Sequence, residues 1–267
     1  MKLNQIALAL VATLGVAGAT HAAVGNGQSY GGTSGDGLLT LSDTVVEVGV
    51  DGQLSNATTD FDHFNFYIDL GLAGGHNATT DVYHFSGSDL SWIPSFAPDH
   101  TGLGVWSFKE VGSQDVWFGN WAKEIGTTET PDNTTYTTFY IGEKGDVATT
   151  VAIDASATYS VETLENFNNT SALPTSTFNV VFGTGAEITS ATGDIAFTNA
   201  AIAADGSFVK SGGVSVTSTS LTNGNLEGQF YGDTAQAVAG IVTAGTNTAD
   251  TSNVAFGGTQ TSYTLIP

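Results

Sequence analysis

Two segments in the first half of the chain combine one histidine with apolar side chains, and both read as loops. The first, Gly71–Ala78, carries Leu72 and His76. The second, Ser91–Gly102, contains two prolines, so it does not read as a central strand. Its chemically distinctive residues are Trp92, Ile93, Phe96 and His100. Exposed loops are normally polar, so these apolar side chains must either bury against the protein or contact a ligand.

Imidazole beside apolar surface is the combination that haem requires. The porphyrin face is large and apolar, and its iron accepts an imidazole nitrogen as an axial ligand. Two such loops could hold the ring from both faces, so we predict His76 and His100 as axial ligands of haem b, with His84 in reserve. The predicted haem pocket is lined by Leu72, Trp92, Ile93 and Phe96. Whether the iron takes one or two histidines stays open.

Each of these residues also has a purely structural interpretation. His76 follows two glycines and His100 follows Pro98-Asp99, so either could be a solvated turn residue. His63 would alternate with Tyr67 on a predicted strand and is expected to be structural. A predicted hairpin over 105–121 holds three tryptophans, which we expect mainly in the core as cross-strand aromatic pairs. Three tyrosines could hydrogen-bond haem propionates, and the pattern does not choose among Tyr67, Tyr83 and Tyr140.

The elements that would position these residues are predicted to be strands. Apolar and polar residues alternate with period two in several segments, which turn dipeptides such as Asp51-Gly52 separate. The alternating segments are Leu39–Leu41, Val45–Val50, Phe64–Ile68 and Phe178–Phe182. Long helical periodicity is absent. The pattern therefore predicts an all-β protein of sandwich or barrel type.

The chain begins with features of a secretory signal peptide. One lysine precedes an apolar run over Ile6–Ala19, and small residues follow it, so we expect residues 1–22 to be removed. Histidine and tryptophan cluster between 63 and 121, which predicts a ligand-binding domain over 23–150 and a second domain over 151–267. There is no cysteine to form a disulfide or accept a lipid. We therefore expect a secreted protein without a membrane anchor.

The charge balance restricts the possible partners. The chain has 26 acidic and 5 basic residues and a net charge of −21. Because phosphate backbones are bound by lysine and arginine, nucleic acid is not an expected partner. The acidity is first a source of solubility. Calcium binding is the alternative, although no Gly-Gly-x-Gly-x-Asp repeats are present.

The C-terminal half carries a pattern of aromatic residues between glycines. It includes Gly228–Gly240 and Val254–Gly258, preceded in order by Thr158–Val161, Phe178, Gly193–Phe197 and Phe208. Over roughly the last 110 residues this resembles the C-terminal β-barrel of the transferrin-binding-protein-B-like family. This chain differs from the family pattern at three places. The family commonly has proline where Asp233 stands, glutamate near Ala237, and a Gly-Gly pair where this chain has Ala239-Gly240. The resemblance implies an eight-stranded antiparallel barrel after a clamp-like, β-rich first domain.

The order of the two parts is similar to that of the secreted haemophores called hemophilins. That resemblance implies capture of haem from a host haem-protein and delivery to an outer-membrane haem receptor. It also implies export through an outer-membrane translocator. No Gly-x-Ser-x-Gly, phosphate-loop or His-Glu-x-x-His motif is present, so we do not expect an enzyme. Two alternatives stay open: a cofactor-free module that binds a host protein, and a structural or adhesive β protein.

Overall fold

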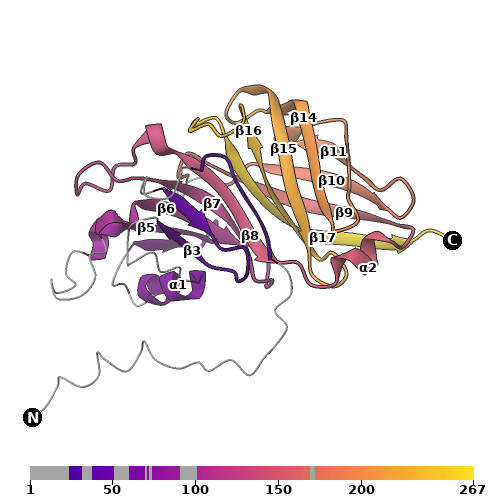
Figure 1. Cartoon of the computed structure of the whole chain (residues 1–267), viewed down its shortest axis with the longest axis horizontal. Helices are drawn as coiled ribbons and strands as arrows, with labels where there is room; N and C mark the ends of the chain where they lie inside the picture. Colours follow the sequence, from indigo (N-terminus) through magenta and orange to yellow (C-terminus); the bar gives the residue numbers. More distant parts are fainter. Residues whose placement is uncertain are drawn as a thin grey trace, which may run out of the picture.

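Two antiparallel sheets pack side by side to form most of the molecule (Figure 1). The computed structural model describes residues 24–31, 38–50, 60–69, 71, 74–90, 101–168 and 172–267. The predicted all-β class is confirmed. No helix in the described part of the chain is long and apolar enough to cross a membrane.

The first sheet has six strands in the order β1-β8-β7-β6-β5-β4, all in antiparallel pairs. Its strands are β1 (Val24–Gln28), β4 (Gly75–Asn77), β5 (Val82–Ser86), β6 (Val105–Glu110), β7 (Val116–Ala122) and β8 (Thr137–Glu143). β6 and β7 form the hairpin that the aromatic pattern predicts. Its three tryptophans are at most 2% exposed, as expected for core residues: Trp106, Trp117 and Trp121.

A helix covers one face of this sheet, where the sequence pattern predicted a strand. The expectation of a strand over Phe64–Ile68 is wrong, because α1 occupies Phe61–Asp69. Spacings of three and four residues place Phe61, Phe64 and Ile68 on one helix face, and all three are at most 5% exposed. The Phe61 ring stacks on Trp117 with centroids 4.9 Å apart. Aromatic packing with the sheet therefore decides in favour of the helix.

The same face is completed by short elements around α1. A two-stranded sheet pairs β2 (Leu39–Leu41) with β3 (Val48–Val50), and its apolar side chains join the core beneath the first sheet. The other short helices among the described residues are η2 (Gly87–Leu90), η3 (Thr101–Leu103), η4 (Asn133–Thr135) and α2 (Val147–Val151). The side chains of His63 and Tyr67 lie outside the described residues, so their predicted roles are untested.

The second sheet is a curled half-barrel of nine strands in the order β12-β14-β15-β16-β17-β9-β10-β11-β13 (Figure 1). Its strands are β9 (Ala155–Glu165), β10 (Thr175–Phe182), β11 (Glu187–Gly193), β12 (Ile195–Ala196), β13 (Asn199–Ala201), β14 (Ser207–Val216), β15 (Leu221–Tyr231), β16 (Ala237–Thr243) and β17 (Val254–Leu265).

The expected eight-stranded barrel is therefore corrected to a nine-stranded half-barrel. The difference arises where the chain passes from β11 to β14. β12 pairs with β14, whereas β13 pairs with β11, at the opposite end of the strand order. The short stretch from residue 195 to 201 thus divides between two neighbours. One isolated bridge, between Ile202 and Phe208, brings the segment after β13 next to β14.

Adjacent aromatic residues on β15 face opposite sides of the curled sheet, as expected from strand geometry. Phe230 points into the half-barrel and lies about 5.3–5.4 Å, between ring centroids, from Tyr159, Phe182 and Phe208. Tyr231 points outward and is still fully buried, because the first sheet covers it. Its hydroxyl donates a 2.8 Å hydrogen bond to the carbonyl oxygen of Gly25 on β1.

The contact between the sheets is a third apolar core. Every residue of β7 is buried, because α1 covers one face of the strand and the half-barrel covers the other. Gly257 on β17 makes room for Phe118, since a Cβ there would lie 2.4 Å from the Phe118 ring. Beside this core, Lys109 Nζ lies 2.9 Å from Glu162 Oε2. The two sheets therefore share extensive buried surface.

Candidate haem-ligand site

The candidate site lies at the free edge of the first sheet, on the hairpin of β4 and β5. The predicted loop Gly71–Ala78 contains β4, so His76 stands on a short edge strand paired with Tyr83. A tight turn joins the two strands. The Asn77 side chain accepts a hydrogen bond from Thr79 N at 2.9 Å, and Asp81 adopts a φ of 58°. Asparagine and aspartate suit such a turn, because their side chains bond nearby backbone.

The imidazole of His76 is held on two sides. Its ring stacks on Tyr83 with centroids 4.2 Å apart and planes 9° from parallel, and Tyr83 in turn stacks on Phe108 at 5.5 Å. Nε2 lies 2.8 Å from Asp81 Oδ1. The His76 side chain remains 28% exposed. The arrangement presents one accessible imidazole at the end of an aromatic row, oriented by a carboxylate.

The backbone before β4 is fixed tightly against β5. Gly74 has a φ of 56°, and a Cβ at this position would lie 1.9 Å from the carbonyl oxygen of His84. Asp89 ties the two strands together, since its Oδ2 accepts hydrogen bonds of 3.0 Å from both Gly74 N and Ser86 N. The turn that precedes His76 therefore has a defined position, and only glycine fits at residue 74.

His84, the reserve ligand, lies on the opposite face of the sheet from His76. On β5 the side chains of Tyr83 and Phe85 face the α1 side, so His84 between them faces the other way. It is half-buried, and burial lowers its pKa from the ordinary value, partly offset by Asp89 and Glu129. Its Nδ1 has no hydrogen-bond partner among the described residues. The two histidines are neighbours across strands without sharing a surface.

The rest of the predicted site falls outside the described residues. His100 and the pocket residues Leu72, Trp92, Ile93 and Phe96 are in this group. The segment after them resumes with η3 and leads into β6. Of the three tyrosines considered for propionates, Tyr140 is 5% exposed and lies between the two sheets, whereas Tyr83 is half-exposed beside His76.

Sequence reasoning missed Asp81 as the partner of His76. The residues are five apart, and they meet only because the turn after β4 reverses the chain. The Asn77–Asp81 stretch, rich in small polar residues, was the available signal for that turn. Among the described residues, no group of three histidine, cysteine, aspartate or glutamate side chains could hold a metal ion. His76 offers a single imidazole, which suits a group that brings its own equatorial ligands, as a porphyrin does.

Comparison with known families bears on the ligand of this part of the chain. Residues 15–135 match the family model described as the HphA N-terminal heme-binding domain. The N-terminal part of the chain is therefore similar to this family. The HphA-type segment includes β1 to β7, α1 and every predicted haem-site residue. The resemblance to hemophilins that the sequence suggested is thereby confirmed.

Two solved structures of one haemoglobin receptor are similar to this chain. HpuA from Kingella denitrificans, crystallised with human haemoglobin, matches with a TM-score of 0.54 at 14% identity, over 93% of this chain and 90% of that one. At this identity the match establishes similarity of fold, and it spans both sheets. The apo structure of the same haemoglobin receptor matches with a TM-score of 0.46 at 17% identity, over 61% of this chain and 63% of its own.

Transferrin binding protein B is a more distant likeness. A double mutant from Haemophilus parasuis matches with a TM-score of 0.45 at 13% identity, over 89% of this chain. The chain spans 45% of the length of that structure.

Proposed function

We propose that this protein is a secreted haemophore, which binds haem b and passes it to an outer-membrane receptor for iron acquisition. The observation that supports this proposal is the match of residues 15–135 to a heme-binding family. Those residues contain both His76 and His100, on segments that also carry apolar side chains. The proposal makes the chain a binding protein with no catalytic role.

Within that proposal, His76 supplies one axial ligand. One of its ring nitrogens bonds Asp81, and the other remains for an iron. A carboxylate on the second nitrogen fixes the ring orientation and raises ligand basicity, as is common for metal-binding histidines. The stack on Tyr83 restricts the ring further. His100 is proposed as the second ligand, with Leu72, Trp92, Ile93 and Phe96 against the porphyrin.

Absorption spectra of the full chain test the ligand assignment. Haem titration of the unaltered protein should give a sharp Soret band with the low-spin spectrum of bis-imidazole iron. His76→Ala and His100→Ala should each shift the spectrum toward high spin and accelerate haem transfer to an acceptor protein. His84→Ala is the matched control, because that side chain faces the other side of the sheet. If only His84→Ala changed the spectrum, the assignment would be wrong.

The source and destination of the haem form a second part of the proposal. HpuA, which shares this fold, was crystallised with human haemoglobin. A host haem-protein is therefore a reasonable donor here, with an outer-membrane translocator for export. Mixing the apoprotein with methaemoglobin and separating the two tests the donor. Haem should move to this chain, and no transfer over hours would remove haemoglobin from the proposal.

A further inference from the structure

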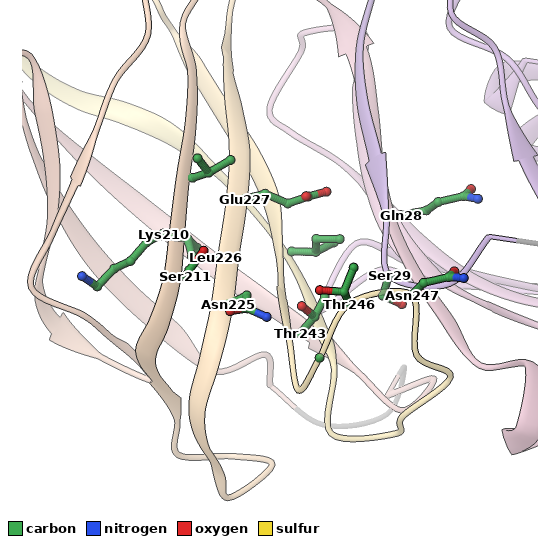
Figure 2. A pocket seen from close by; sticks show the side chains of 13 residues that line it. Gln28, Ser29, Lys210, Ser211, Asn225, Leu226, Glu227, Thr243, Thr246 and Asn247 are labelled. Carbon is green, nitrogen blue, oxygen red and sulfur yellow. The ribbon is translucent and has the colours of Figure 1, made fainter.

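A polar cavity lies between the two sheets, beside β1, at the opposite edge of the first sheet from the candidate haem site on β4 and β5. It has a volume of about 270 Å³, close to the roughly 300 Å³ at which small-ligand pockets begin. Its walls are β1, the outer face of β14–β16 and the loop 245–247. Figure 2 shows Glu227 directed into the space between β15 and β1, while Gln28 and Lys210 point away from it.

Glu227 is the unusual member of this cavity. Its side chain is half-buried against β1, where a Cβ on Gly27 would lie 2.4 Å from Glu227 Oε1. The Tyr140 ring is also adjacent, since the same Cβ would lie 2.5 Å from it. Glutamate is rarely buried without a partner. Yet Glu227 forms no hydrogen bond or ion pair with any residue that the structure describes.

No ion pair among the described residues includes this carboxylate. Lys144 is engaged with Asp205 at 3.2 Å, and Lys109 with Glu162 at 2.9 Å. Lys210 lines the cavity and points away from Glu227 (Figure 2). Burial accordingly raises the pKa of Glu227. The chain as a whole carries a net charge of −21, and such a negative field attracts cations from solution.

The remaining walls suit an organic cation better than a metal ion. Ca²⁺ takes six to eight oxygen ligands, usually with several carboxylates, and here one carboxylate stands without another nearby acid in the lining. Around it lie amide and hydroxyl groups of Asn225, Thr243 and Thr246, together with the apolar Val209 and Ile241. A guanidinium head with an aliphatic stem matches that mixture, because it donates several hydrogen bonds and also packs against apolar surface.

We propose that this cavity binds a single guanidinium or ammonium group, such as a basic side chain of a partner protein, with Glu227 as its counter-ion. The proposal is independent of haem binding, since no predicted haem-site residue lines the cavity. The bound cation would pair with the Glu227 carboxylate, which is half-buried and has no partner in the described part of the fold. It would also place the bound group across both sheets, because β1 belongs to one and β15 to the other.

Amide chemical shifts of the full chain provide the test. Methylguanidinium is the cationic probe, and methylurea is its neutral counterpart of similar shape. A doubly blocked Gly-Arg-Gly peptide presents the same group as a side chain. Methylguanidinium and the peptide should shift the amide signals of Gly27 and Thr243 in a saturable manner. Methylurea should not. Tighter binding of the peptide would identify a protein side chain as the source, and equal binding would identify a free small cation.

Variants separate this site from general electrostatic attraction. Glu227→Gln should weaken methylguanidinium binding at least about tenfold, and it should not unfold the chain, since it removes a buried unpaired charge. Glu187→Gln on β11 is the control for loss of one negative charge and should bind as the unaltered protein does. Equal binding by Glu227→Gln, equal shifts with methylurea, or no saturable shift with either cationic probe would overturn the proposal.

Discussion

Replacing Phe230 with alanine tests the proposed separation between a half-barrel that stabilises the fold and a first sheet that binds haem. Phe230 is fully buried and contacts the rings of Tyr159, Phe182 and Phe208 at 5.3–5.4 Å between centroids. Four packed rings leave little freedom to close a cavity, so the loss should be about 3–5 kcal/mol, as for other buried phenylalanines. At about 2–4 °C per kcal/mol for a chain of this size, the thermal midpoint should fall by roughly 6–20 °C.

Thermal unfolding and haem transfer are measured on the same preparations. The haem off-rate of Phe230→Ala should stay within about twofold of the unaltered protein at 25 °C, because the haem site is assigned to the other sheet. Val209→Ala is the control: its side chain is 69% exposed, and exposed sites usually change stability by less than about 0.5 kcal/mol. A fast off-rate with an unchanged midpoint would refute this division of roles, and so would equal midpoints for the two variants.

Three further predictions concern single contacts. Tyr231→Phe removes a buried hydrogen bond to Gly25 and should lower the free energy of unfolding, measured with denaturant, by about 1–3 kcal/mol. Tyr263→Phe is the control and should leave that free energy nearly unchanged. Similar losses for the two variants would mean that the hydrogen bond between the sheets does not stabilise the fold. Burial raises the pKa of Glu227 in the folded protein. The free energy of unfolding should therefore fall as the pH rises from about 4.3, the pKa of an unfolded glutamate, through the pKa of the folded state, and Glu227→Gln should lack that fall. Parallel curves of stability against pH for the two proteins would contradict the burial of this carboxylate. Gly74→Ala must place a Cβ 1.9 Å from a carbonyl oxygen at a positive φ, so it should lower the thermal midpoint and accelerate haem loss. Gly75→Ala, which has open space around it, should do neither. Equal behaviour of the two variants would mean that the tight backbone before β4 does not position His76.

The aromatic hairpin was predictable because its pattern is local. Trp106 and Trp121 are direct cross-strand partners, and alternation alone places both on one face. The segment after residue 60 was not predictable in the same way. Phe64 and Ile68 are an even number of positions apart and so fit the alternation of a strand. Phe61 and Phe64 are three apart and so fit the spacing of a helix. Only packing of Phe61 on Trp117 chooses the helix, and that partner is more than 50 residues away.

The candidate site shows the same limit. The sequence marks His76 as a histidine among glycines, but its contact with Asp81 depends on the turn at residues 78–80. The division of the chain between β12 and β13 was likewise hidden. Both strands are too short to show the apolar–polar alternation of a strand. Their partners, β14 and β11, lie near opposite ends of the strand order. Long-range pairing, which one sequence does not display, settles these features.

The position of β17 has a consequence for a chain that becomes available for folding from its N-terminus onward. The last strand pairs with β9 over residues 155–165, about a hundred positions earlier, and this pairing joins the β9–β11 hairpins to the β14–β16 hairpins. Until the final residues are available, each group carries an unpaired edge, which is a known hazard for aggregation. Without β17, the β9–β11 and β14–β16 groups would meet only at the other end of the strand order, through the short β12 and β13 and the bridge between Ile202 and Phe208. Assembly of the half-barrel therefore waits for β17.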